Sequence, residues 1–213
     1  MTQLEFAVTD IVADTYAATP QLLVKLHIEE TTGDQVHALV LRAQVRIDAQ
    51  RRPYTHAEAE GLLDLFGPRS RWVDTLKPLL WMHATAVVQG FTASADVDLV
   101  LPCTYDFEVV GTKYLQALRD GTVPLELLFS GTVFARAGTG IAVTQIPWDR
   151  EARAELPVAV WRSLMDSFFP NSGWLRIDRE TLDALVKYRS GAGFTSWEAA
   201  FSTLLSGAAE AVS

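Results

Sequence analysis

Apolar and polar residues alternate through most of the first two-thirds of the chain. The clearest runs have an apolar residue at every second position of segments 22–28, 39–47 and 95–101. Successive side chains of a β-strand point to opposite faces, so this period is typical of strands with one buried and one solvated face. The four residues Thr31–Asp34, TTGD, supply a turn between the first two runs. This part of the chain is therefore predicted to be β-structure.

Other segments continue this pattern. The predicted strands among them are Leu4–Val8, Trp81–Val88, Tyr105–Val109, and the hairpin of Leu125–Arg136 and Ile141–Ile146 around the turn AGTG. A helix interrupts the strands where Thr55–Glu58, THAE, forms a capping box, and Gly67-Pro68 ends that helix. A second short helix is predicted over Thr112–Arg119.

The last third of the chain has helical periodicity. Residues Val158 to Phe168 place a large apolar side chain at every third or fourth position. Asp178 and Thr195 are predicted to cap two further helices. In the second of these, one side is apolar: Trp197, Phe201, Leu204 and Leu205.

Strands followed by helices indicate an α+β fold. We predict an antiparallel β-sandwich-like sheet of about seven to eight strands, with C-terminal helices packed on one face or end. We also predict one domain over 1–213, in which 1–150 is mostly β and 151–213 mostly helical.

The composition excludes several classes of function. The formal net charge is −8 over 213 residues, which disfavours nucleic-acid binding and anionic membrane surfaces, since both need clustered Lys and Arg. The single cysteine, Cys103, cannot form an intramolecular disulfide. The first ten residues lack the basic and apolar regions of a signal peptide, and no apolar run approaches the ~20 residues of a membrane helix. We expect a cytoplasmic protein without membrane insertion.

Motifs for known chemistry are weak. His56-Ala57-Glu58 and Pro102-Cys103 partly match the zinc deaminase signature, but Asp106 stands where the second cysteine ligand belongs, and Glu58 is explained by the capping box. The four histidines have no ligand spacing, and no phosphate-binding loop or nucleophile elbow is present. We therefore assign no catalytic residue, no metal ligand and no cofactor.

One basic cluster differs from the acidic background. If Lys25 and His27 lie on the strand next to the second run, which contains Arg42 and Arg46, they join a face formed by four arginines: Arg42, Arg46, Arg51 and Arg52. One hypothesis is that this face binds an acidic partner segment or an anion. The alternative is cross-strand pairing with acids such as Asp96 and Asp98.

Three stretches, 38–67, 123–149 and 156–188, together resemble an uncharacterised actinobacterial domain family. The genes of that family often lie beside those for uptake [NiFe] hydrogenases. The resemblance covers nearly the whole chain, implies an accessory role in hydrogenase assembly or function, and transfers no catalytic residue. A weaker likeness, from Phe169-Pro170 and the later LDAL of Leu182–Leu185, is to SecB-type export chaperones.

These observations favour a non-enzymatic accessory protein that binds a protein partner, with a hydrogenase subunit or maturation factor suspected. The alternatives are a small-molecule or metal-binding domain, or an enzyme, and a SecB-like peptide-binding chaperone. The helix containing Trp197, Phe201, Leu204 and Leu205 follows a glycine-containing link, Gly191–Gly193. It is predicted either to dock on its own core or to bind a partner or form a homo-oligomer.

Overall fold

A computed structural model describes residues 2–106, 109–137 and 140–212. The chain divides into two compact units, Met1–Trp174 and Leu175–Ser213, and the single domain over 1–213 stays a prediction.

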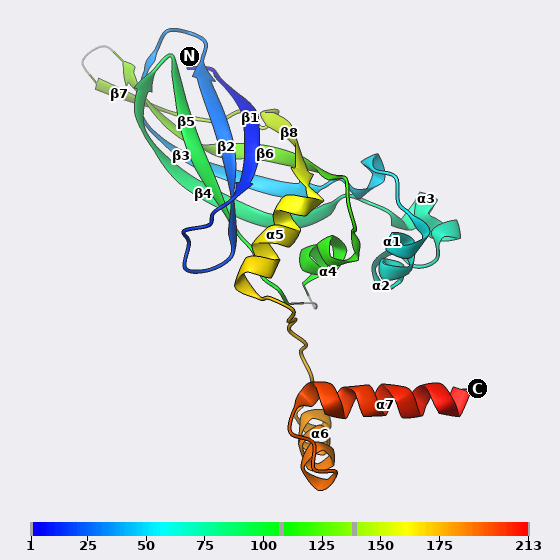
Figure 1. Cartoon of the computed structure of the whole chain (residues 1–213). Helices are drawn as coiled ribbons and strands as arrows, with labels where there is room; N and C mark the ends of the chain where they lie inside the picture. Colours follow the sequence, from blue (N-terminus) through cyan, green and yellow to red (C-terminus); the bar gives the residue numbers. More distant parts are fainter. Residues whose placement is uncertain (1, 107–108, 138–139, 213) are drawn as a thin grey trace. The chain divides into compact units, whose positions relative to one another are not determined.

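The described residues of the first unit form two antiparallel sheets (Figure 1), as predicted. The three-stranded sheet has the order β1-β2-β5, with β1 at Leu4–Ala13, β2 at Gln21–Glu30 and β5 at Ser94–Pro102. The α+β class and the sandwich arrangement of the sheets are therefore confirmed.

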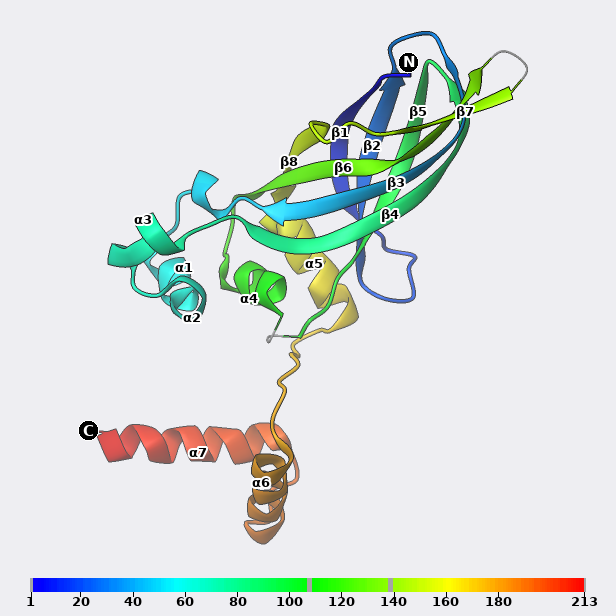
Figure 2. The same ribbon diagram turned by 180° about the vertical axis from the view of Figure 1, so that it is seen from behind.

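The five-stranded sheet has the order β4-β3-β6-β7, and β8 pairs with the other half of the same edge of β6. Its strands are β3 (Gln35–Ile47), β4 (Leu79–Thr92), β6 (Thr122–Ala137), β7 (Gly140–Gln145) and β8 (Glu151–Pro157). Figure 2 shows the long strands of this sheet from behind.

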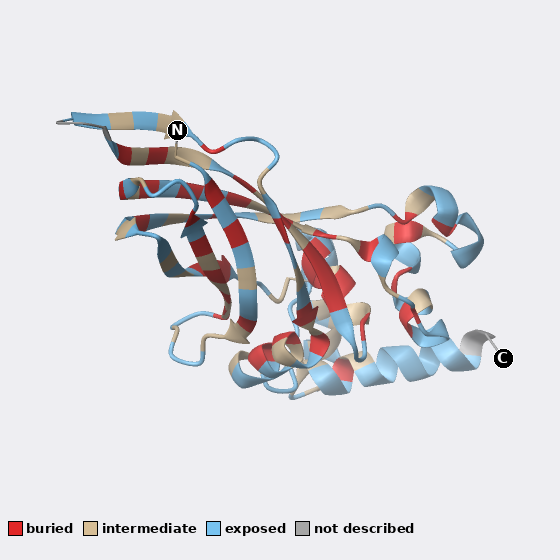
Figure 3. Cartoon of the chain, turned by 90° about the horizontal axis from the view of Figure 1, so that it is seen from above, coloured by how far each residue is buried: buried red, intermediate tan, exposed pale blue. Residues whose placement is uncertain are grey.

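The core lies between the sheets. Buried and exposed residues alternate along the strands in Figure 3, as the period of two predicted. The rings of Phe6 on β1 and Phe129 on β6 stack with centroids 4.3 Å apart, so the two inner faces are in direct contact.

The turn Thr31–Asp34 joins two strands that belong to different sheets. β2 pairs with β1 and β5, and β3 pairs with β4 and β6. The buried carboxylate of Glu30 stabilises the turn by accepting hydrogen bonds from the backbone N–H groups of Thr32 and Asp34. The chain therefore crosses from one layer of the sandwich to the other at this turn.

The helices of the first unit lie at one end of the sheets (Figure 1). The predicted capping box of Thr55 and Glu58 is present at the start of α1. The helix α5 packs against β1 and β8, and α4 packs against β4. The helical segments are η1 (Ala49–Arg51), α1 (His56–Gly61), α2 (Leu63–Phe66), η2 (Arg69–Arg71), α3 (Trp72–Thr75), α4 (Val110–Ala117) and α5 (Val158–Phe168).

Several predicted elements differ from the observed ones. β8 was assigned to the helical third of the chain and is a strand. The strand predicted over Tyr105–Val109 is represented by an isolated bridge between Asp106 and Trp174, and its residues 107–108 lie outside the described residues. The predicted turn AGTG likewise includes 138–139, which are outside them.

The second unit consists of α6 (Arg179–Gly191) and α7 (Trp197–Val212). Asp178 caps α6, as predicted, by accepting a hydrogen bond from the Thr181 N–H. At α7 the Ser196 hydroxyl accepts from the Ala199 N–H, so the predicted cap at Thr195 is displaced by one residue. Within the described residues, no helix is both long and apolar enough to cross a membrane.

Candidate functional site

The predicted basic face is divided between the two sheets. On β2, Lys25 Nζ lies 2.7 Å from Asp98 Oδ2, and His27 Nδ1 lies 2.7 Å from Asp96 Oδ1. Arg42 lies on β3 in the other sheet. The hypothesis that Lys25 and His27 occupy the strand next to Arg42 is therefore wrong. Cross-strand pairing with Asp96 and Asp98 is confirmed for these two side chains.

Two other arginines of the predicted face also lie near acids. Arg46 Nη1 lies 3.4 Å from Glu126 Oε2 across the β3–β6 pair. Arg51 Nε lies 4.0 Å from Asp48 Oδ2, and both side chains are partly exposed. These contacts balance part of the charge of Arg46 and Arg51, and binding of a partner or an anion by Arg42, Arg46, Arg51 and Arg52 stays a prediction.

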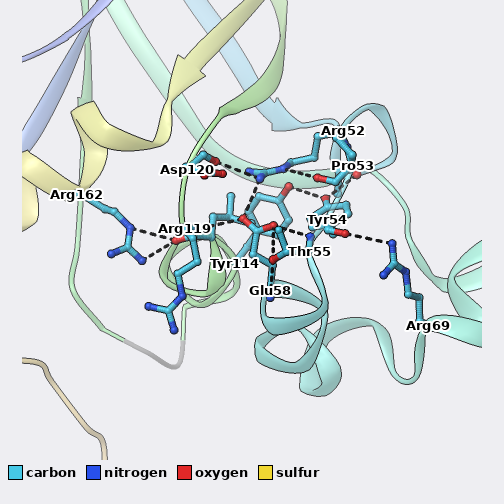
Figure 4. A network of polar contacts seen from close by, with 12 residues as sticks. Arg52, Pro53, Tyr54, Thr55, Glu58, Arg69, Tyr114, Arg119, Asp120 and Arg162 are labelled. Atoms are coloured by element: carbon cyan, nitrogen blue, oxygen red, sulfur yellow. Dashed lines mark hydrogen bonds and ion pairs between the residues drawn. The ribbon is translucent and has the colours of Figure 1, made fainter.

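Arg52 lies apart from the others, in a buried polar network at the start of α1 (Figure 4). Its Nη2 atom lies 3.0 Å from Glu58 Oε1 and donates to the Asp120 carbonyl at 3.2 Å. Its side chain is 7% exposed and that of Glu58 is 1% exposed. The guanidinium carbon lies 5.1 Å from the centre of the Tyr54 ring. Arg52 thus connects η1, α1 and the loop before β6.

The Glu58 carboxylate accepts hydrogen bonds from several directions. The backbone N–H groups of Thr55 and Arg119 donate to it at 2.9 and 3.0 Å, in addition to Arg52. Burial raises the pKa of Glu58, but these hydrogen bonds and the Arg52 charge outweigh that effect and hold the pKa below its usual range. Glu58 is therefore ionised at neutral pH and acts as an acceptor.

Two tyrosine hydroxyls complete the network. Tyr54 Oη donates to the Ala49 carbonyl at 2.6 Å and lies 2.7 Å from Tyr114 Oη. Burial raises the pKa of Tyr54 to about 12 and also raises that of Tyr114. Both phenols stay neutral at physiological pH, so they can donate hydrogen bonds but do not supply a phenolate base.

A pocket of about 490 Å³ adjoins this network. The buried Nη1 atom of Arg52, whose side chain contributes to the lining, has no hydrogen-bond partner in the described structure. The lining residues are Arg51, Arg52, Pro53, Tyr54, Thr55, Glu58, Asp120, Gly121, Thr122, Pro124 and Glu155. The pocket can offer hydrogen bonds to a small polar molecule, and its three acids make it a poor site for a free anion.

The outer face of the five-stranded sheet carries exposed apolar side chains. Val87 on β4 is 76% exposed and lies opposite Val40 on β3, which is also exposed. In the next row of the sheet, Phe134 on β6 lies opposite Val143 on β7. Ile141, two residues from Val143, extends the same face. We call these five residues the outer apolar strip.

The predicted interaction helix is α7. The rings of Trp197 and Phe201 stack 5.8 Å apart, and the Arg189 guanidinium lies 4.3 Å from the Trp197 ring. Leu204 and Leu205 are exposed. The two aromatic side chains are thus held within the second unit, and binding of a partner by α7 stays a prediction.

Metal and thiol chemistry find little support in the part of the chain that the structure describes. No group of three or more His, Cys, Asp or Glu side chains there could hold a metal ion. Burial raises the pKa of the Cys103 thiol to about 12, so the thiol is protonated at neutral pH and is a poor nucleophile. His56 pairs with Glu60 at 3.4 Å rather than with a residue of the partial deaminase signature.

A family model described as a family of unknown function, DUF6084, matches residues 1–213. The chain belongs to DUF6084. No curated protein matches it.

Solved structures similar to this DUF6084 chain include two β-glucosidases. The enzyme from Kluyveromyces marxianus is 12% identical, with a TM-score of 0.26, over 73% of this chain and 15% of the enzyme. β-Glucosidase 3B from Thermotoga neapolitana is 15% identical, with a TM-score of 0.26, over 71% of this chain and 16% of the enzyme. The DUF6084 chain thus spans less than a fifth of either enzyme, and similarity this low carries no conclusion about fold or activity.

The sequence revealed only part of the buried network. The THAE motif identified Thr55 and Glu58, and Arg52 was noted only as a member of the basic face. Tyr54 and Tyr114 are 60 residues apart and are joined only by the packing of α4 beside α1. The RRPY segment before the motif was the one local signal of an arginine and an aromatic side chain near Glu58.

Proposed function

We propose that the protein is a non-enzymatic accessory protein that binds another protein through the outer apolar strip. The observation that supports this most directly is the exposure of Val40, Val87, Ile141 and Val143 on one face of a sheet whose other face forms the core. An antiparallel sheet with one solvated face usually presents polar side chains there. A contiguous exposed apolar face commonly marks an interaction site.

The suspected partner is a subunit or maturation factor of a [NiFe] hydrogenase. This part of the proposal rests on the resemblance to an actinobacterial family whose genes lie near those of uptake hydrogenases. Deletion of the gene should lower hydrogen uptake and leave the large subunit incompletely processed. Unchanged uptake and complete processing in the deletion strain would contradict the hydrogenase role.

A direct binding measurement tests the surface itself. We expect the Val87→Lys variant to bind the purified hydrogenase large subunit or a maturation factor at least about tenfold more weakly, because a lysine charge would be desolvated at the interface. The matched control is Val100→Lys, which makes the same change on β5 of the other sheet, where Val100 is also exposed. If both variants bind like the wild type, the outer apolar strip is not the interface.

The same measurement separates the accessory role from a SecB-like chaperone. A chaperone of that kind would bind many unfolded polypeptides, whereas an accessory protein would bind its folded partner. We expect the chain not to retain a reduced, permanently unfolded model polypeptide. Retention that is lost in Val87→Lys would favour the chaperone instead.

The second candidate function is the binding of a small polar molecule, and it is favoured by the pocket beside Arg52. A ligand carbonyl could accept from a guanidinium N–H group that the described structure leaves without an acceptor. Thermal unfolding measured with a panel of small neutral amides tests this function. A saturable rise in Tm that is absent in Thr122→Trp, which fills the pocket from its exposed lining, would support it.

A further inference from the structure

The strand β7 forms an unprotected edge of the five-stranded sheet. Its six residues, Gly140–Gln145, have the sequence GIAVTQ, without a charged residue or a proline. Within the described residues, β6 is the only strand that pairs with it. Natural proteins usually protect exposed edges with charges, prolines, bulges or covering segments, because free N–H and C=O groups attract another strand.

The backbone groups on the free side of β7 can be identified from its register. The Ile146 N–H donates to the Gly131 carbonyl at 3.0 Å, so residue 146 faces β6. Hydrogen-bonding direction alternates along an antiparallel strand. Ile141, Val143 and Gln145 therefore direct their N–H and C=O groups away from β6, on the side where a further strand could pair.

Other edges of the two sheets have neighbours or charges. β1 lies beside β8, where Arg150 Nη1 is 2.9 Å from Glu5 Oε1. β4 is uncharged like β7, but β5 and α4 lie against it. β5 carries Asp96 and Asp98. The exposed edge at β7 thus differs from the rest of the molecule.

We propose that β7 pairs antiparallel with β7 of a second copy of this chain, about a twofold axis at Val143. In this register Val143 lies opposite the partner's Val143, and Ile141 lies opposite the partner's Gln145. At the axis a residue lies opposite its own copy, so a charged residue at position 143 would meet the same charge on the partner strand. The edge formed by β7 has no charge to repel its own copy.

Pairing of β7 with its copy would also join the outer apolar strips of the two chains into one surface. Val143 is 59% exposed, and its side chain points to the same face as Ile141. Cross-strand contact between β-branched side chains stabilises neighbouring strands. One strand pair is a small interface, so the dimer is expected to be weak and reversible.

Salt should strengthen this dimer. Each chain has a formal net charge of −8, and the two chains repel each other at long range. At physiological salt this repulsion is screened beyond about 8 Å, whereas pairing of an uncharged strand is little affected. An interface formed by ion pairs would weaken with salt instead.

Sedimentation velocity of the full chain tests the proposal over protein concentrations from about 5 to 500 µM. We expect a concentration-dependent dimer whose dissociation constant falls between low and high salt. Val143→Lys and Val143→Pro should each raise that constant at least about tenfold. The proline removes an N–H that points away from β6, so β6–β7 pairing and the melting temperature should be retained.

The control variant is Val87→Lys, which alters the same face of the sheet on β4 and should leave the dimer unchanged. A wild-type chain that is monomeric at all concentrations would overturn the proposal. So would a dimer that survives both Val143 substitutions, or one that Val87→Lys disrupts. Because no partner protein is present, the outcome is independent of the proposed hydrogenase interaction.

Discussion

At the scale of single residues, the buried pair of Arg52 and Glu58 shows what local sequence can and cannot predict. The role of Glu58 in a capping box was predicted from THAE and is confirmed. The ion pair between Glu58 and Arg52, which precedes the helix, was not predicted. The two side chains meet only because the chain turns at Pro53. The spacing of neighbouring residues predicts a helix cap. Whether a charged side chain is buried depends instead on which distant segments pack over it.

The pair should contribute strongly to stability. Removing one partner of a buried ion pair costs about 3–5 kcal/mol, because the other charge stays buried. We expect Glu58→Gln to lower the free energy of unfolding in urea by about that amount. The matched control is Asp48→Asn, which removes the partly exposed acid 4.0 Å from Arg51 and should cost less than about 1 kcal/mol. Equal losses of unfolding free energy in Glu58→Gln and Asp48→Asn would show that the buried pair stabilises the fold no more than the partly exposed one.

The low pKa of Glu58 gives this contribution a defined pH dependence. The carboxyl titrates near about 4.3 in the unfolded chain and below its usual range in the folded protein. Its contribution is therefore complete above about pH 4.3 and is lost as the pH falls through the lower, folded value. The difference in unfolding free energy between wild type and Glu58→Gln should narrow on acidification from pH 6 to about pH 3. If the difference in unfolding free energy between the two proteins stays constant over this pH range, the low pKa of Glu58 does not contribute to stability.

At the scale of elements, strands with a strict alternation were predictable and their partners were not. The turn at Thr31–Asp34 suggested that β2 and β3 are neighbours, but a turn fits equally a hairpin or a crossing between sheets. Strand pairing depends on segments that are distant in the sequence. Leu22 on β2, for example, lies opposite Leu101 on β5. β8 was missed because EARAELP favours a helix by local propensity. In the sheet its small residues Ala152 and Ala154 lie opposite Leu127 and Leu125.

The close approach of β3 and β6 at Gly131 can be tested by substitution. It has φ +146°, and a Cβ atom there would lie 2.0 Å from the Val40 carbonyl oxygen. We expect Gly131→Ala to lower the free energy of unfolding by more than about 3 kcal/mol, since backbone strain of about 1–3 kcal/mol adds to the steric clash. Gly33 has φ +81° with no atom within 4 Å of the added Cβ, so Gly33→Ala should show the strain alone. Urea unfolding of both variants measures the difference, and equal losses would exclude the clash.

At the scale of the whole molecule, sequence and structure agree on an α+β protein that is β-rich first and helical later. The boundary between the two compact units after Trp174 was not predicted, because the linking residues resemble an ordinary loop. The exposed apolar residues of β3, β4 and β7 were likewise not recognised. In a sequence, a valine on the outer face of a strand resembles one in the core until the register is known.

The link between the units should be the first site of proteolysis. Residues 171–176 are exposed and lie outside helices, and Arg176 is followed by Ile177. Exposed stretches without regular structure are cleaved before helices and strands, which must first open locally. Lys77 and Arg52 precede prolines, a position that trypsin cleaves poorly. We therefore expect brief trypsin treatment to cut after Arg176, giving fragments 1–176 and 177–213 that mass spectrometry identifies.

The control for this cut is Arg176→Gln, which should slow the first cleavage and leave the melting temperature unchanged, because residue 176 is exposed. If the helices of the second unit are independently stable, fragment 177–213 should persist, whereas an unstable pair would be digested further at Lys187 and Arg189 of α6. A first cut between β-strands of the first unit would contradict the boundary after Trp174. The expected result instead follows from the regular structure on either side of the link: the helix α5 lies before it, α6 and α7 lie after it, and the residues between are exposed.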